Sequence, residues 1–380
     1  MSASTGANDK EFLSDFSEKD AKFDLHKGLS TQIARLYAME SSDGVQGFMS
    51  GERFIDFKTY AGRIGECGSW LKFWQTESAI KLIDARFCKV SYCPMCQFRR
   101  SLKWRAKFLA ELPAIQETYP THKWVFLTLT VRNCEMSELR SQIQDMGKAF
   151  SRMTKLASYP LVGAIKSLEV TRVWDWYDKS GNFIGRHGTT WFYRSNDPDK
   201  LNWTVKPTNE VHPHFHILGL VPASYFTGRG YVKQEQWADM WKQSLRVDYD
   251  PIVHIQAVKN KKKGKAPISS PEEVETDDSG MIKGICETLK YTVKENDLVG
   301  RFCDDEDANS NWLKAITQEL HKLRKVDYGG VLKAFGKEVE ASMDDLIAID
   351  DDKETATEKE GKERIAHYNF HLKKYIMMSA

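Results

Sequence analysis

Apolar residues recur at strand-like and helix-like spacings through the middle of the chain, from about residue 120 to residue 325. The strand-like segments are rich in β-branched and aromatic residues, and the helix-like segments repeat apolar residues every three or four positions. We expect strands over 123–131, 161–176, 211–221 and 252–258, and helices over 137–156, 233–245 and 281–295. This alternation predicts a domain that mixes strands and helices.

The segments around this domain differ from it in composition. The predicted parts are a polar extension (1–55), a cysteine-rich basic module (56–118), the domain of mixed strands and helices (119–330) and an acidic tail (331–380). Within the domain, residues 178–210 and 259–280 are rich in turn-forming or charged residues and are expected to be loops. Residues 338–363 hold 11 acidic and 3 basic residues, which predicts a solvated, partly disordered tail.

The net charge of +2 hides a segregated distribution, because residues 81–107 contain eight basic residues and one acidic residue. A hydrophobic content of 41% is enough for a core and excludes wholesale disorder. No apolar run approaches the ~18–20 residues that cross a bilayer, and the N-terminal residues lack the pattern of a secretory signal. We therefore expect a soluble cytoplasmic protein with no membrane partner.

Three histidines alternate with other residues in His212-Pro213-His214-Phe215-His216, at the start of a predicted strand. Side chains at i and i+2 project from one face of a strand, so His214 and His216 point the same way, with Phe215 buried behind them. Two imidazoles from one strand can bind a divalent ion and leave positions open for a substrate oxygen. An ordinary surface or core pair is the alternative.

Glu169 lies in the otherwise apolar segment Leu168-Glu169-Val170. Burying an unpaired charge costs several kcal/mol, so this carboxylate needs a partner. If its strand pairs with the histidine strand, Glu169 completes a His-His-Glu site that suits Mn²⁺ or Mg²⁺ as well as Zn²⁺. A salt bridge with an arginine across the sheet is the alternative.

A potential nucleophile lies in the helix expected over residues 281–295. On a helix, Glu287, Tyr291 and Lys294 share one face. A tyrosine with an ordinary pKa near 10 needs a metal or a nearby base to attack phosphate. Glu287 can activate the tyrosine or a water, and Lys294 can bind the phosphate. Ordinary helix-surface pairing explains the same spacing.

Four cysteines, Cys67, Cys88, Cys93 and Cys96, have the spacing C-x20-C-x4-C-x2-C. Cys93-Pro94-Met95-Cys96 has the form of a knuckle, and Cys67 precedes Gly68. Such spacing predicts a structural Zn²⁺ site with four thiolates, and scattered buried cysteines are the alternative.

A basic helix is expected directly after these cysteines. Its side chains are predicted to bind DNA. The basic side chains would contact phosphates, and the tryptophan would stack on a base or pack against the DNA. The residues are Arg99, Arg100, Lys103, Trp104 and Arg105. A solvated helix face is the alternative.

Three strings in order closely resemble the motifs of rolling-circle plasmid replication initiators of the HUH endonuclease superfamily. The first is Phe126–Asn133 (FLTLTVRN), the second is His212–His216 (HPHFH), and the third is Glu287 with Lys290, Tyr291 and Lys294. The resemblance covers about residues 60–335. It implies an α+β domain with an HUH-type central antiparallel sheet of about five strands and helices on one face. Such a protein would be prokaryotic and cytoplasmic, and would bind and nick plasmid origin DNA.

The resemblance also implies roles for individual residues. His214 and His216, with Glu169, would hold Mg²⁺ or Mn²⁺. Tyr291 would attack a phosphodiester, leaving a free 3′-OH and a 5′-phosphotyrosine, and Glu287 would promote the terminating cleavage through water. Arg132 and Lys290 are expected to contact DNA, and a host helicase and polymerase are expected partners.

Two other classes of protein stay open. One is an HUH transposase or relaxase with the same chemistry. The other is a non-enzymatic, zinc-dependent DNA-binding protein in which the histidines and Tyr291 are structural. The origin sequence, the metal used in cells, the oligomeric state and the host do not follow from the sequence, nor does the choice between water and a second tyrosine in termination.

Overall fold

The computed structural model describes residues 11–16, 18–40, 44–77, 80–227, 230–258, 284–285, 287–289, 292–336, 346–347 and 361–378. The loop expected at 259–280 lies outside the described residues, as does most of the acidic run at 338–363. Lys290 and Tyr291 also lie outside them. Within the described residues, no helix combines the length and the apolar character that crossing a membrane requires.

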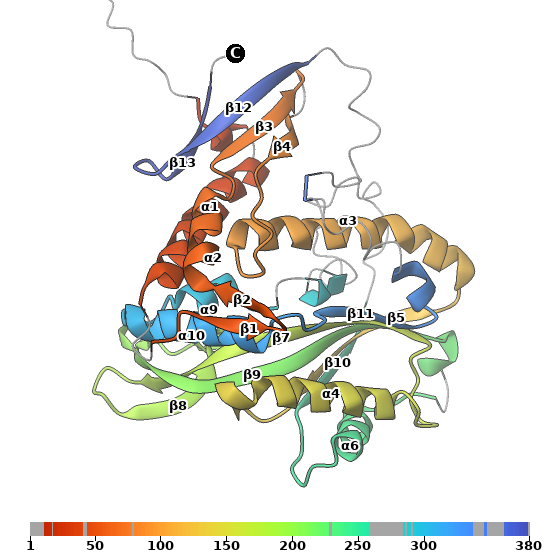
Figure 1. The fold of residues 1–380 in the computed structure, drawn as a ribbon. Helices are drawn as coiled ribbons and strands as arrows, with labels where there is room; N and C mark the ends of the chain where they lie inside the picture. The colour runs from red at the N-terminus through yellow and green to blue at the C-terminus, as the bar shows by residue number, and fades with distance from the viewer. Residues whose placement is uncertain are drawn as a thin grey trace, which may run out of the picture.

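A curled antiparallel sheet forms the centre of the α+β domain (Figure 1). Its main path is β10 (Val253–Ala257), β5 (Lys123–Thr130), β9 (Thr204–Val221), β7 (Gly163–Tyr177) and β11 (Val326–Gly330). Two short strands lie off this path: β6 (Cys134–Glu135) pairs with β9, and β8 (Phe183–Gly188) pairs with β7. The expected five-stranded path is confirmed, and β5, β7 and β10 begin and end within two residues of the predicted limits.

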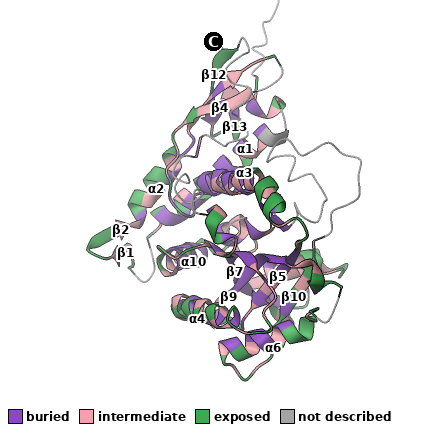
Figure 2. Cartoon of the chain, turned by 90° about the vertical axis from the view of Figure 1, so that its right-hand side faces the viewer, coloured by how far each residue is buried: buried purple, intermediate pink, exposed green. Residues whose placement is uncertain are grey.

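Helices cover both faces of this sheet, so the prediction of helices on one face is wrong (Figure 1). One face is covered by α4 (Leu139–Met153) and α6 (Gln234–Leu245), and α3 (Pro94–Thr118) crosses the other. On the α3 face, Phe108 and Ile115 pack in one cluster with Leu218 of β9. The physical reason is that β5 and β9 are buried on both faces, as Figure 2 shows, so both need cover.

The expected loop at 178–210 is largely regular structure, which corrects the prediction. It contains β8, α5 (Thr189–Arg194), the 3-10 helix η3 (Lys200–Asn202) and the first residues of β9. Stacked aromatic rings hold this segment together. The Trp176 and Phe192 rings lie 5.3 Å apart, and those of Trp191 and Trp203 lie 4.9 Å apart. The turn-forming composition of this segment indicated a loop. Its regular structure was not predicted because stacking between rings that are distant in sequence leaves no local pattern.

The helix expected over 281–295 is interrupted. Residues 284–285 and 287–288 are helical, but 292–294 are not, and a new helix α9 (Glu295–Val299) begins after Lys294. The backbone carbonyl of Thr292 instead accepts a hydrogen bond from the Val170 amide of β7, at 2.7 Å. The prediction that Lys294 shares a helical face with Glu287 is therefore wrong, because this part of the chain pairs with the edge of the sheet.

Strands from residues 70–85 and from residues 362–377 build a second sheet together. Its order is β13 (Lys374–Met377), β12 (Lys362–Asn369), β3 (Trp70–Gln75) and β4 (Ile80–Ala85), and all pairs are antiparallel. Figure 1 shows β12 lying along β3 although they come from opposite ends of the chain. These strands at 362–377 were not predicted, since the sequence analysis treated residues 331–380 as a tail.

The remaining elements lie around these two sheets. The helix α1 (Glu18–Ala38) packs against α2 (Phe57–Glu66), α3 and α10 (Glu306–Glu319). The other short elements are the hairpin of β1 (Gly47–Ser50) and β2 (Arg53–Asp56) and the 3-10 helices η1 (Leu13–Asp15), η2 (Met136–Glu138) and η4 (Ala223–Tyr225). Helix α1 thus joins the second sheet to the α+β domain.

Tyr375 of β13 tests the contribution of the last strands to stability. Its side chain is fully buried, its ring lies 5.1 Å from that of Tyr368, and its hydroxyl donates to the Gly68 carbonyl. We expect Tyr375→Ala to lower the free energy of unfolding by about 3–5 kcal/mol, the usual cost of removing a buried aromatic ring. Leu372→Ala, at a side chain that is 46% exposed, is the control and should change it by less than about 0.5 kcal/mol. Equal losses in urea unfolding would contradict the observed packing.

Candidate metal and active site

Two neighbouring strands, β9 and β7, bring the two histidines and the buried glutamate together. His214 and His216 project from the same face of β9, and Glu169 lies directly opposite His214 on β7. The strand pairing on which the predicted site depended is therefore present. One ligand atom from each of these three residues can be chosen so that all lie within 4.8 Å of one another. The group can hold a metal ion.

Both imidazoles direct Nε2 toward the same carboxylate oxygen. The distance from Nε2 to Oε2 of Glu169 is 3.0 Å for His216 and 3.7 Å for His214. The opposite ring nitrogens have other partners: Nδ1 of His214 lies 3.3 Å from the His212 carbonyl, and Nδ1 of His216 lies 3.2 Å from the Thr128 hydroxyl. Such outer hydrogen bonds orient the rings of metal-binding histidines. Nitrogen and oxygen ligands of this kind fit a divalent cation.

Glu169 has its charge partner in Lys294. The Lys294 Nζ lies 2.9 Å from Oε1 of Glu169, which is 2% exposed, and 3.2 Å from the Thr190 hydroxyl. Burial alone would lower the pKa of Lys294, but the charge of Glu169 outweighs it and holds that pKa above its usual value. The salt-bridge partner of Glu169 is thus a lysine at the N-cap of α9, and not the arginine across the sheet that was considered from the sequence.

The described residues near Tyr291 approach the same group. The Oε1 of Glu287 lies 4.0 Å from Nε2 of His216, and the Glu287 side chain is 44% exposed. Leu289 is buried against the α3 face of the sheet, and Thr292 pairs with β7. Glu287 and Lys294 therefore both lie next to the group formed by Glu169, His214 and His216, which we call the His-Glu group. They come from two separate short segments. The predicted nucleophile, Tyr291, and the predicted DNA contact, Lys290, lie outside the described residues.

His212 is not one of the three possible metal ligands, but hydrogen bonds link it to a chain of polar side chains. Its Nδ1 lies 3.1 Å from Oδ1 of Asn133, whose amide donates to Glu210 at 3.1 Å. Glu210 in turn pairs with Arg186 at 2.7 Å. Burial, followed by the neighbouring His214, lowers the pKa of His212 to about 4, so the ring is neutral at physiological pH. This chain of contacts was not predicted from the sequence. The only indication was that Asn133 is the last residue of the first of the three motifs.

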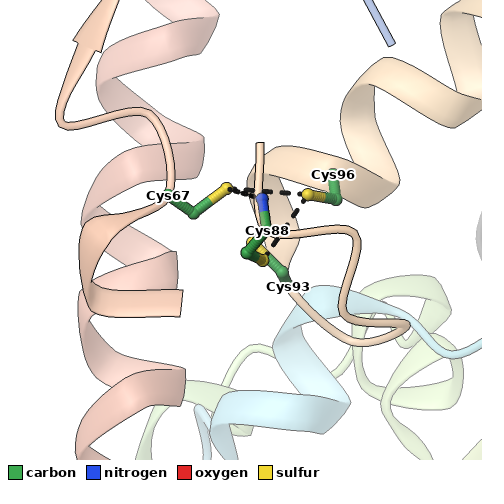
Figure 3. Close-up of side chains that lie close together, drawn as sticks. All are labelled: Cys67, Cys88, Cys93 and Cys96. Carbon is green, nitrogen blue, oxygen red and sulfur yellow. Dashed lines mark hydrogen bonds between the residues drawn. The ribbon is translucent and has the colours of Figure 1, made fainter. Parts of the chain in front are cut away.

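The four predicted cysteines also come together (Figure 3). The Cys67 and Cys96 sulfurs lie 3.5 Å apart, and those of Cys88 and Cys96 lie 3.7 Å apart. A tetrahedral ion with sulfur ligands at 2.3 Å separates the sulfurs by about 3.8 Å, so the spacing fits a metal site. Backbone amides support it: the amide of Cys88 lies 3.3 Å from the Cys67 sulfur.

Local backbone conformation forms the turns that this cluster needs. Cys67 ends α2 and is followed by Gly68 at φ +62°, where a glycine costs least. Cys93 caps α3, and Cys96 lies in its first turn. A buried cation accompanies the cluster, because the Lys27 ammonium donates to the carbonyls of Gly65 and Cys67 at 2.6 and 2.8 Å. If the cluster holds a divalent ion with four thiolates, the charge of Lys27 would offset part of its net negative charge.

The basic helix predicted from 99–107 is part of α3, but most of its cations are buried. Arg99 is 4% exposed, Lys103 3% and Arg105 7%. The Arg99 guanidinium donates to the carbonyls of Leu346 and Ile347, both at 2.9 Å. This burial does not favour the predicted phosphate contacts, because α3 passes between the sheet and other parts of the chain.

The other predicted DNA contacts are more accessible. Arg100 is half-buried and donates to the carbonyls of Lys89 and Val90, and the Trp104 ring stacks 6.2 Å from Tyr328. Arg132 is exposed, with its guanidinium 4.1 Å above the Tyr249 ring. Among the predicted contacts that the structure describes, these side chains have the exposure that contact with a ligand requires.

Comparison with known proteins shows that this chain is similar in sequence to replication proteins. A family model described as a replication protein matches residues 79–376. The chain is 32% identical over 329 residues to a Protein rep from Bacillus amyloliquefaciens, covering 83% of this chain and 84% of the relative. It is 28% identical over 332 residues to a Protein rep from Lentilactobacillus hilgardii, covering 86% and 90%. No solved structure matches the chain.

The cysteine cluster can be tested by metal content. We expect Cys93→Ser to remove about one bound metal ion per chain, because all four sulfurs point to one centre and a serine hydroxyl is a poor replacement for a thiolate. Cys303→Ser is the control, since Cys303 lies outside the cluster, and should keep the full content. Elemental analysis of the purified proteins gives the result, and unchanged metal in the Cys93 variant would contradict the assignment.

Proposed function

The chain belongs to the Rep_1 family of replication proteins, and we propose that it starts rolling-circle replication of a plasmid by nicking one strand of the origin DNA. The observation that carries the proposal is the meeting of Glu169, His214 and His216 with Glu287 and Lys294, from the segments on either side of Tyr291. A group of metal ligands next to a potential nucleophile fits phosphodiester chemistry.

Tyr291 is the proposed nucleophile. Its hydroxyl oxygen attacks the phosphorus of the phosphodiester, the bond to the 3′ oxygen breaks, and a proton ends on that oxygen. The products are a free 3′-OH, which a polymerase can extend, and a 5′-phosphotyrosine that keeps the second strand end attached. The position of Tyr291 in sequence supports this role, because Thr292 pairs with β7 beside Glu169. Reversal of the step rejoins the strand.

The residues around Tyr291 have distinct proposed roles. His214, His216 and Glu169 would hold Mg²⁺ or Mn²⁺, which when bound polarises the phosphate and neutralises developing charge. Lys294 holds Glu169 in place and provides positive charge beside the phosphate. Glu287, being half-exposed, can take a proton from a water in the terminating cleavage.

Further parts of the proposal concern the rest of the chain. The cysteine cluster would hold a structural Zn²⁺ that ties α2 to the start of α3. Origin DNA is the proposed partner, and Arg100, Trp104 and Arg132 are the proposed contacts that have the exposure to reach it. A host helicase and polymerase would act on the nicked DNA.

Replacing the nucleophile tests the proposal most directly. We expect Tyr291→Phe to abolish both nicking and the covalent adduct on a single-stranded origin oligonucleotide with Mn²⁺, because phenylalanine lacks the attacking oxygen, while binding persists. Tyr193→Phe, at a side chain that is 53% exposed, is the control and should nick normally. Denaturing gels and mass spectrometry of the Tyr–DNA conjugate give the readout. Cleavage by the Tyr291 variant would reject this nucleophile.

Glu287 is tested separately from the nucleophile. We expect Glu287→Gln to retain the first nick but to slow hydrolytic release by about 10²–10⁴-fold, the usual contribution of a general base. The phosphotyrosine adduct would then accumulate. Time courses of nicking and of adduct decay separate the two steps, and normal decay in the variant would show that this carboxylate has no part in termination.

A further inference from the structure

A small cavity lies beside the proposed nicking site. It has a volume of about 80 Å³, several times the 10–15 Å³ that one water needs. Its walls come from α3, from the residues at the start of β11, and from Leu289 and Thr292, which precede and follow the Tyr291 segment. Trp104 contributes an aromatic wall.

Among the described residues, the cavity is lined by two basic side chains and by no carboxylate. They are Arg100 and Lys325. Among the described residues no carboxylate forms an ion pair with Lys325, whose ammonium lies 4.6 Å above the Tyr92 ring. Burial, and then repulsion from Arg100, lowers the pKa of Lys325 to about 7. Two basic groups that share a cavity, with no carboxylate among the described lining residues, are expected to attract an anion, and a bound anion favours the charged form of Lys325.

A polar side chain in the lining also lacks a partner. Gln97 is 5% exposed, and its Oε1 makes no hydrogen bond to any of the described residues. A buried amide left without a partner costs free energy, and a ligand in the cavity can supply the missing partner. The side-chain oxygen and nitrogen of an amide can exchange places, so Gln97 can present a donor to a bound oxygen. Hydroxyls of Ser91 and Ser101 add further donors to the lining.

The position of the cavity relates it to the His-Glu group. The Lys325 carbonyl accepts from the Leu168 amide at 2.9 Å, and the Thr292 carbonyl accepts from the Val170 amide at 2.7 Å. These two β7 residues flank Glu169 in the chain. Two of the segments that line the cavity therefore hydrogen-bond to β7 on either side of Glu169 in sequence, which relates the cavity to the group of Glu169, His214 and His216.

We propose that this cavity binds a backbone phosphate of the DNA strand close to the nicked bond, through Arg100 and Lys325. The inference rests on the proposed function, because it assumes that DNA reaches the His-Glu group. The Trp104 ring is positioned to pack against the sugar or base attached to that phosphate. Free inorganic phosphate has the same chemistry, so the test has to separate the two sources.

The test uses the full chain with the Tyr291→Phe substitution, so that binding is measured without cleavage. Origin oligonucleotides with one neutral methylphosphonate at successive positions are compared by fluorescence anisotropy. We expect one position near the nick to weaken binding about 10-fold. In a protein that also carries Lys325→Gln, binding is already about 10-fold weaker, and the same methylphosphonate has no further effect. Lys333→Gln, at an exposed lysine, is the matched control and should keep the full methylphosphonate effect.

Other outcomes decide between the alternatives. If every methylphosphonate weakens the Lys325→Gln protein as much as its parent, the subsite is wrong, whereas nicking by the Tyr291→Phe protein would overturn the proposed function instead. Competition by inorganic phosphate that disappears with Lys325→Gln, without any methylphosphonate effect, would assign the cavity to free phosphate and overturn the DNA assignment. Unfolding curves check that the Lys325 variant is folded, and a Lys325→Arg protein should restore most of the binding.

Discussion

The charge of Glu169 is the constraint on which the arrangement of the domain depends. A carboxylate that is 2% exposed in the middle of a sheet is stable only with partners, and those of Glu169 include His214, His216 and the Lys294 ammonium. Satisfying this charge requires β7 and β9 to pair in one register and the start of α9 to lie against them. The same contacts that stabilise the charge therefore assemble the group that can hold a metal ion.

The helix α3 connects this group to the rest of the molecule. Its N-terminal turn carries Cys93 and Cys96, and its later turns pack Phe108 and Ile115 against the sheet on the face that bears the histidines. A metal at the cysteines would therefore fix the start of a helix that also covers the His-Glu group. Arg99, Lys103 and Arg105 of α3 fit this structural role, since they are buried against other parts of the chain.

The sequence predicted the features that depend on local periodicity. Alternation placed His214 and His216 on one face, the cost of a buried charge indicated the partner strand of Glu169, and spacing grouped the four cysteines. It did not predict partners from distant segments: Lys294 at Glu169, β12 beside β3, or the ring stack of Trp176 and Phe192. Arg99 and Lys103 were predicted to contact DNA phosphates, because sequence spacing does not show which face of a helix is covered by other segments. Tyr291 stays a prediction.

The pairing of β12 with β3 has a consequence for synthesis of the chain. The ribosome makes β3 by residue 75 and reaches β12 only at residue 362. At about 5–20 residues per second, the edge of β3 waits tens of seconds for its partner. During that interval an unpaired strand edge is open to pairing with other chains, so full closure of the cysteine-bearing part is a late event, and a nascent chain stalled before residue 362 is a candidate for aggregation.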